Sequence, residues 1–172
     1  SEVMNGKIWF ESRKGEGTTF YFEIPFRHAE ESNKTNITTK PFSDFIFLNK
    51  NILIIDDTLE IHHYLSEVLV KTGAHLIHAM NARDALRIIE SQSTIDLILL
   101  DIRLPDINGI DLTKLIKKQC NIPIVAQTAL AFSGDRIKVL EAGCDDYLTK
   151  PIDRIQLLMS LSKFLVDQKP VW

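Results

Sequence analysis

The chain has 172 residues, a formal net charge of −3 and a hydrophobic content of 45%, which is ample for one core. The weakly acidic balance gives no general attraction to nucleic acid or to an anionic membrane, and no apolar stretch approaches the roughly 18 residues that span a bilayer. The two cysteines, Cys120 and Cys144, lie far apart, so we expect free thiols in a reducing compartment. Because the sequence does not begin with Met and shows no signal peptide, we expect an excised fragment.

Residues 1–27 have the pattern of a β-hairpin. Two aromatic-rich segments flank the turn-forming residues 13–17, and in the second segment Phe20 and Phe22 alternate with Tyr21, as in a half-buried strand. The hairpin therefore has one apolar face. Because a two-stranded hairpin is marginal in water by itself, we expect it to need upstream sequence or a surface on which to pack.

Residues 28–49 are mostly polar and have the composition of a linker. The end of this segment is too apolar for a free tether, and we expect it to pack on a flanking domain. Its apolar residues are Phe42, Phe45, Phe47 and Leu48.

From Asn51 onward the sequence alternates between strand and helix patterns. We predict strands over 52–56, 75–79, 95–101, 122–127 and 145–149, and helices over about 58–72, 82–92, 109–118, 134–142 and 153–167. Five such βα units predict an α/β fold, a doubly wound, flavodoxin-like parallel sheet of five strands in the order 2-1-3-4-5, with the N-terminal hairpin as an appendage.

The predicted strands end in residues suited to phosphate and metal chemistry. The first strand ends in Asp56 and Asp57, the third ends in Asp101, the fourth leads to Thr128 and the fifth leads to Lys150. Because ligands of open α/β sheets bind outside the carboxyl ends of the strands, we expect these side chains to converge at one edge of the sheet.

The charges of this set predict a metal. Asp56, Asp57 and Asp101 would repel one another unless a cation compensates them, and hard oxygen donors suit Mg²⁺. One Mg²⁺ and the Lys150 ammonium would balance the three carboxylates. A phosphoryl group on one carboxylate would then meet a metal, an ammonium and the Thr128 hydroxyl, which is the equipment of phosphoryl transfer.

Residues 51–167, about two thirds of the chain, resemble a response-regulator receiver domain, which we delimit as residues 50–168. Four motifs carry the resemblance in the family's order and spacing: Asp56-Asp57, Asp101-Ile102-Arg103-Leu104-Pro105-Asp106-Ile107-Asn108-Gly109, Ala126-Gln127-Thr128-Ala129 and Asp146-Tyr147-Leu148-Thr149-Lys150-Pro151.

The resemblance implies a role for each site residue. Asp101 attacks phosphorus and becomes an acyl phosphate. Mg²⁺, with Mn²⁺ as a substitute, is bound by Asp57, Asp101 and the backbone carbonyl of Arg103, and by Asp56 directly or through water. Lys150 pairs with Asp101 and later with the phosphoryl oxygens.

The resemblance also implies a switch. Thr128 turns inward to donate a hydrogen bond to the phosphoryl group, and Tyr147 follows it from an exposed to a buried rotamer. Arg103 and Leu130 occupy the positions that tune phosphate lifetime in the family. The peptide bond before Pro151 is expected to be cis, a form essentially confined to proline.

The hairpin has a resemblance of its own, to the end of a histidine-kinase ATP-binding domain. The matching segments are Met4-Asn5-Gly6-Lys7-Ile8, Gly15-Glu16-Gly17-Thr18-Thr19-Phe20 and Ile24-Pro25. Kinase remnant (1–27), linker (28–49) and receiver in this order imply a hybrid sensor histidine kinase. The ATP site of such a kinase lies upstream, so we expect no ATP binding by this fragment.

The implied partners follow from this arrangement. Asp101 would take phosphate from the His of a kinase phospho-His domain and exchange it with a His phosphotransfer domain, and the face of the last two helices and the last strand could pair in a dimer. We expect no direct contact with nucleic acid or membrane, a cytoplasmic location and a parent kinase anchored in the inner membrane. Whether the fragment counts as an enzyme stays open, because it would catalyse only its own phosphorylation and dephosphorylation.

Two other functions stay open. One is a phosphorylation-independent docking module, which the intact set of site residues disfavours. The other is an Asp-nucleophile, Mg²⁺-dependent phosphatase similar to the haloacid dehalogenases, which carry a second Asp where this chain has Arg103. A flavodoxin is disfavoured because the loop after the first strand is acidic.

Four further residues are assigned to structure or solvent rather than to chemistry. His62 and His63 are adjacent on a helix and do not share a face, so we expect solvated surface residues. Asp106 and Asp111 are expected at helix N-termini or in solvent, not as ligands. For Tyr147, a plain core position is the alternative to a switch.

Overall fold

The computed structural model describes residues 7–23, 45–91, 94–129 and 133–166. The chain divides into two compact units, residues 1–39 and 40–172. The division falls inside the predicted linker, and the exact domain boundaries stay a prediction. In the part of the chain that the structure describes, no helix is both long and apolar enough to cross a bilayer.

The predicted hairpin is confirmed in the first unit. Strands β1 (Lys7–Arg13) and β2 (Gly17–Glu23) pair antiparallel. One face carries the cross-strand pairs Ile8–Phe22 and Phe10–Phe20, whose four side chains are 63–73% exposed. On the other face the rings of Trp9 and Tyr21 stack at a centroid distance of 5.4 Å.

The second unit is built on a five-stranded parallel sheet, as predicted. Its strands, in the order β4-β3-β5-β6-β7, are β3 (Asn51–Ile55), β4 (His75–Ala79), β5 (Leu97–Asp101), β6 (Ile124–Thr128) and β7 (Asp146–Thr149). The central strands β5 and β6 are buried along their whole length, which explains the apolar run with which each of them begins.

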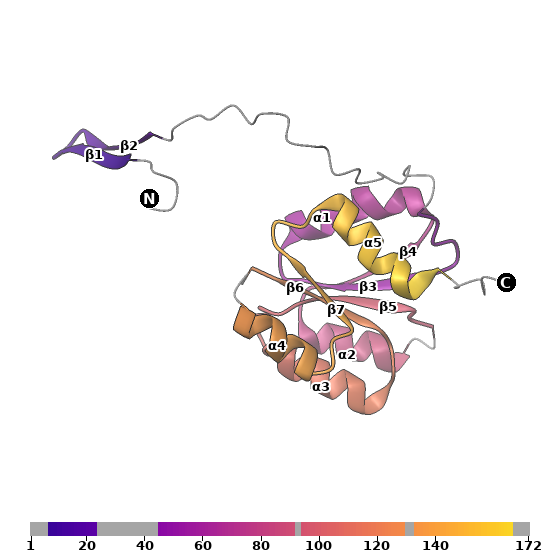
Figure 1. Cartoon of the computed structure of the whole chain (residues 1–172). Coiled ribbons are helices and arrows are strands. Elements are labelled where there is room, and N and C mark those ends of the chain that lie inside the picture. The colour runs from indigo at the N-terminus through magenta and orange to yellow at the C-terminus, as the bar shows by residue number, and fades with distance from the viewer. Residues whose placement is uncertain (1–6, 24–44, 92–93, 130–132, 167–172) are drawn as a thin grey trace. The chain divides into compact units, whose positions relative to one another are not determined.

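Helices cover both faces of this sheet (Figure 1). The helices are α1 (Leu59–Leu69), continued by a 3₁₀ turn (Val70–Thr72), α2 (Ala82–Ser91), α3 (Gly109–Gln119), α4 (Ser133–Glu141) and α5 (Arg154–Leu165). Helices α1 and α5 share one core with the sheet, and α2, α3 and α4 share the other. The predicted doubly wound architecture is confirmed.

The helix ends follow the sequence rules. The 3₁₀ turn after α1 stops at Gly73, which adopts a left-handed φ of 77°, as a helix-terminating glycine does. Asp153 caps α5, since its carboxylate accepts a hydrogen bond of 2.9 Å from the backbone N–H of Gln156. Both cysteines are free.

The apolar end of the predicted linker packs on the α/β unit. Phe45 and Phe47 are buried in the core that includes α1 and α5, and the Phe47 N–H donates to the Thr72 carbonyl at 2.7 Å. Leu48 stays largely exposed, and Phe42 lies outside the described residues. Two of the four aromatic and aliphatic residues therefore extend the hydrophobic core ahead of β3.

Gln127 is the unusual residue of the sheet. Its side chain is fully buried on β6, and neither its amide nitrogen nor its amide oxygen has a hydrogen-bond partner among the described residues. A buried polar group without a partner retains its full desolvation cost. Gln127 pairs in register with Asp101, so this cost falls next to the candidate site.

We expect Gln127→Met to raise the free energy of unfolding by roughly 1–3 kcal/mol, because an apolar side chain of similar length removes the unpaired amide. Urea denaturation of the two proteins measures the difference. Gln119→Met on exposed α3 surface is the control and should stay within about 0.5 kcal/mol of the wild type. A loss of stability in Gln127→Met would show that the amide has a partner in solution.

Deleting residues 1–27 should leave the thermal unfolding midpoint of the α/β unit unchanged, because the hairpin belongs to a separate compact unit. Circular dichroism of the truncated and full chains at 222 nm follows the unfolding transition directly. A clear drop in the midpoint would mean that the hairpin packs on the α/β unit as an accessory element.

Candidate functional site

Three carboxylates gather at the carboxyl edge of the parallel sheet. One oxygen of each of Asp56, Asp57 and Asp101 lies within 4.8 Å of the others. Asp56 and Asp101 are buried, whereas Asp57 is exposed. The convergence predicted from the strand ends is confirmed, and the cluster is open to solvent on the Asp57 side.

Lys150 joins two of these carboxylates. Its Nζ lies 2.8 Å from Asp56 Oδ2 and 2.7 Å from Asp101 Oδ2. Burial lowers the pKa of Lys150, but the hydrogen bonds and charges of Asp101 and Asp56 outweigh burial and raise the pKa above its ordinary value. Lys150 is therefore held in its protonated, ammonium form. The structure also places a cis peptide bond between Lys150 and Pro151.

The loop after β5 contacts the Asp101 carboxylate through a backbone N–H group. The Arg103 N–H donates to Asp101 Oδ1 at 3.1 Å, and Asn108 caps α3. At Gly109 a Cβ atom would lie 2.6 Å from the Asp101 carbonyl oxygen, a distance that no side chain tolerates. Glycine at this position lets α3 start directly against the end of β5.

The residues fit a divalent cation. Three carboxylates and the Lys150 ammonium leave an excess of two negative charges, which one divalent ion neutralises. The donors are hard oxygens, the ligand type of Mg²⁺ and Mn²⁺. The exposed carboxylate of Asp57 offers the ion a path from solvent.

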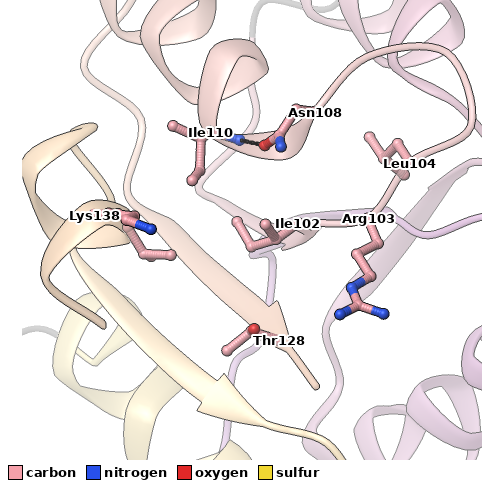
Figure 2. Close-up of a pocket in the computed structure, with 8 residues that line it drawn as sticks. Ile102, Arg103, Leu104, Asn108, Ile110, Thr128 and Lys138 are labelled. Atoms are coloured by element: carbon pink, nitrogen blue, oxygen red, sulfur yellow. Dashed lines mark hydrogen bonds between the residues drawn. The ribbon is translucent and has the colours of Figure 1, made fainter. Parts of the chain in front are cut away.

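Thr128 stands at the end of β6, next to Lys150. Its backbone carbonyl accepts a 2.8 Å hydrogen bond from the Lys150 N–H. The side chain is buried and lines a pocket of about 420 Å³ between the β5–α3 loop and α4, together with Arg103 and Lys138 (Figure 2). This pocket gives the region around the hydroxyl room to rearrange.

Tyr147 lies on the edge strand β7, directly beside β6. Its ring is half-buried against the core of α2, α3 and α4. It also lines a shallow groove of about 360 Å³ with Met159 and Lys163 of α5. Leu130, the other residue expected near the switch, lies outside the described residues.

The expectation that His62 is a solvated surface residue is wrong. His62 is buried, and its imidazole contacts the Asp56 carbonyl and the ring of His78. The helical spacing contained the signal, because residues 62, 65 and 69 share the buried face of α1. His63, the adjacent residue, is exposed as expected.

Asp106 has a structural role that helix patterns alone do not assign. Its carboxylate accepts hydrogen bonds of 3.1 Å from the N–H groups of Ala82 and Arg83 at the start of α2. Burial raises the pKa of Asp106, but these and two further backbone hydrogen bonds, from the N–H groups of Asp106 and Ile107, outweigh it and lower the pKa. Asp111 lies in the first turn of α3. Asp111 is thus a helix N-terminal charge, as expected, whereas Asp106 caps α2 rather than the helix that follows it in the chain.

Comparisons with known proteins agree with this geometry. Residues 52–162 match the model of the family described as response regulator receiver domain. The transcriptional regulatory protein CpxR of Escherichia coli K12 is 36% identical over 118 residues, which cover 69% of this chain and 50% of CpxR. The chain thus spans about half the length of such curated relatives. The polar-differentiation response regulator DivK of Brucella anthropi is 30% identical over 121 residues, covering 69% of this chain and 98% of DivK.

Solved structures show the same likeness. The Francisella response regulator 1452 receiver domain superimposes with a TM-score of 0.66 at 30% identity, covering 70% of this chain and all of that one. The receiver domain structure of Saccharomyces cerevisiae Ssk1 with the histidine phosphotransfer protein Ypd1 gives a TM-score of 0.67 at 29% identity, covering 73% and 95% of the two chains. With its fold, its carboxyl-edge site and these matches, the chain belongs to the response regulator receiver domain family.

Proposed function

We propose that this domain is the phosphoacceptor of a two-component phosphorelay and that Asp101 receives the phosphoryl group from a kinase histidine. The observation that carries the proposal is the set of contacts around Asp101. One carboxylate oxygen accepts from Lys150 at 2.7 Å, the other accepts from the Arg103 N–H at 3.1 Å, and two more carboxylates lie within 4.8 Å.

The contacts favour transfer to Asp101 for an electrostatic reason. A carboxylate oxygen of Asp101 attacks phosphorus, the P–N bond to the donor histidine breaks, and the imidazole leaves with the electron pair of that bond and takes up a proton. Lys150 then moves its hydrogen bond from the Asp101 carboxylate to the phosphoryl oxygens, since its ammonium already lies at hydrogen-bonding distance from Asp101. Preorganised charges of this kind stabilise the transition state without reorganisation.

The metal belongs to the same proposal. Asp57, Asp101 and the backbone carbonyl of Arg103 would hold Mg²⁺ or Mn²⁺, with Asp56 as a direct or water-mediated partner. When bound, the ion supplies positive charge to the phosphoryl oxygens. The exposed Asp57 carboxylate supports the proposal because it leaves an open face for both ion and donor.

We further propose the switch implied by the resemblance. Thr128 would donate to the phosphoryl group and Tyr147 would turn inward, changing the face formed by α4, β7 and α5. The pocket beside Thr128 and the position of Tyr147 on the neighbouring edge strand support this coupling. Arg103 reaches the same pocket, which supports its role, with Leu130, in setting the phosphate lifetime.

The proposed donor or acceptor is a phospho-His domain, either of a kinase or of a phosphotransfer protein. The receiver domain of Ssk1 is bound to a histidine phosphotransfer protein in its solved structure. In this chain Leu59, which opens α1 two residues after Asp57, is 59% exposed. An exposed apolar residue beside the site suits docking of such a domain. A dimer through the α4–β7–α5 face is the other proposed assembly.

The parentage in a hybrid sensor histidine kinase stays a proposal that rests on the hairpin and on the order of segments. The exposed Ile8, Phe10, Phe20 and Phe22 support it, because a hairpin with such an apolar face is expected to pack against another layer of a larger domain. We place the receiver in the cytoplasm, the parent kinase at the inner membrane, and the ATP site upstream.

The direct test is intact mass after incubation with a small acyl phosphate, with and without Mg²⁺. We expect the wild type to gain one hydroxylamine-labile phosphoryl group only with Mg²⁺, and Asp101→Asn to gain none, because the amide removes the nucleophile and one metal charge. Asp111→Asn, an exposed α3 carboxylate, is the control and should react as the wild type does. Uptake by Asp101→Asn would contradict the assignment. No uptake by folded wild type would favour a docking module.

Lys150→Ala should slow phosphoryl uptake by about tenfold or more, since one preorganised charge on the transferring group is lost. It should also abolish the phosphorylation-dependent NMR shifts at Thr128 and Tyr147. Mg²⁺ affinity should persist or rise, because the ammonium no longer competes for the carboxylates. Lys114→Ala, which removes an exposed ammonium on α3, is the matched control. A large loss of Mg²⁺ affinity in Lys150→Ala would refute this account of the charges.

A further inference from the structure

A pair of histidines lies next to Asp56 of the acidic cluster, on two elements that contribute no carboxylate to the cluster. His62 is on α1 and is buried, and His78 is on the edge strand β4 and is more exposed. The Nδ1 atoms of the two rings are 2.7 Å apart. The other ring nitrogen of His62, Nε2, lies 2.7 Å from the backbone carbonyl oxygen of Asp56.

Elementary donor and acceptor rules determine which ring nitrogens of this pair carry a hydrogen. A carbonyl oxygen only accepts, so His62 Nε2 carries a hydrogen and donates it to Asp56. With neutral rings, His62 Nδ1 is then an acceptor and His78 Nδ1 is the donor to it. If His62 were protonated, the hydrogen between the rings would belong to it, but Nε2 would still donate. The bond to Asp56 is therefore the same in either charge state.

This bond completes the fixation of Asp56. The Asp56 N–H donates to the Ala79 carbonyl at 3.2 Å, and its two carboxylate oxygens accept from the Thr58 N–H at 2.9 Å and from Lys150 at 2.8 Å. His62 holds the remaining polar atom, the carbonyl oxygen. Every polar atom of Asp56 thus has a hydrogen-bond partner. Two of these contacts involve the end of β4: the Ala79 carbonyl accepts from the Asp56 N–H, and His78 contacts His62, which donates to the Asp56 carbonyl.

The Asp56 carbonyl belongs to the peptide that connects Asp56 to Asp57. Rotation of that peptide would turn the carbonyl away from α1 and move both carboxylates, because they are attached to its two Cα atoms. Among the described residues, the exposed Asp57 side chain has only one hydrogen bond, a long one of 3.4 Å from the Thr58 hydroxyl. Its direction therefore depends on the backbone more than on side-chain partners.

We propose that His62 is a positioning residue for the metal site, holding the Asp56–Asp57 peptide so that both carboxylates face the shared centre, and that His78 orients His62. The inference deepens the proposed function and rests on it, because it assigns residues that shape the same metal site. Neither histidine touches the ion or the phosphoryl group. Outer partners of this kind typically change metal affinity by about 10–100-fold when removed.

The test compares Mn²⁺ affinity, read from the EPR signal of free Mn²⁺, in the full chain and in four variants. His62→Leu removes the donor, His62→Gln retains an N–H at similar reach, and His78→Leu removes the partner ring. His63→Leu is the matched control, the same change at the adjacent exposed residue of α1. We expect about a tenfold weaker affinity in His62→Leu, most of the affinity in His62→Gln, a smaller loss in His78→Leu and no change in His63→Leu.

A second readout needs no metal. ¹⁵N NMR of the imidazoles of the wild-type chain should show neutral His62 as the Nε2–H tautomer and neutral His78 as the Nδ1–H tautomer. This readout, with His78→Leu at a more exposed position, decides the matter if His62→Leu fails to fold.

The outcomes separate the inference from the proposed function. If the wild type binds Mn²⁺ and accepts a phosphoryl group but His62→Leu binds Mn²⁺ as His63→Leu does, the positioning role is overturned while the proposed function stands. An Nδ1–H tautomer of His62 overturns it equally. If the wild type neither binds Mn²⁺ nor accepts a phosphoryl group, the proposed function itself fails, and the inference with it.

Discussion

The rest of the site depends on the contact of one ammonium with two buried carboxylates. Asp56 is fully buried and Asp101 nearly so, and two like charges at this depth would repel each other. Lys150 lies between them at 2.8 and 2.7 Å, and its ammonium offsets this repulsion. Removal of one partner from such a group leaves an uncompensated buried charge, which is strongly destabilising.

The parallel sheet explains why these three residues meet. Asp56 follows β3, Asp101 ends β5 and Lys150 follows β7, so each is delivered to the same edge by strands that run in the same direction. Close packing of the β5–α3 loop also contributes, because Gly109 allows α3 to begin directly against the end of β5.

Local patterns predicted the features that depend on them alone. The apolar runs identified four of the five strands of the parallel sheet, and their polar ends identified the carboxylates and Lys150, because burial on both faces favours an apolar segment. The edge strand β4, which carries His75 and His78, has no such run. The strands of 95–101 and 122–127 begin two residues later than predicted, at Leu97 and Ile124. Before the first of these, the Asp96 carboxylate accepts from the N–H of Asn51, and before the second stands Pro123, which has no N–H for the ladder.

Features that depend on tertiary contacts were beyond such patterns. The pairing of His62 with His78 joins a helix to an edge strand, and Asp106 caps the start of α2 at Ala82, 24 residues earlier in the chain. Adjacent helix residues do not share a face, so His62 can be buried while His63 is exposed. Gln127 shows the same limit, because its sequence neighbours do not reveal that its buried amide has no hydrogen-bond partner among the residues that the structure describes.

A crystal structure of the domain grown with Mg²⁺ tests the central claim most directly, namely that the three carboxylates form one divalent-cation site balanced by Lys150. The account predicts a single ion about 2.0–2.1 Å from oxygens of Asp57 and Asp101 and from the Arg103 carbonyl, with Lys150 still paired to a carboxylate. No ion at saturating Mg²⁺, or an ion held away from Asp101, would contradict it.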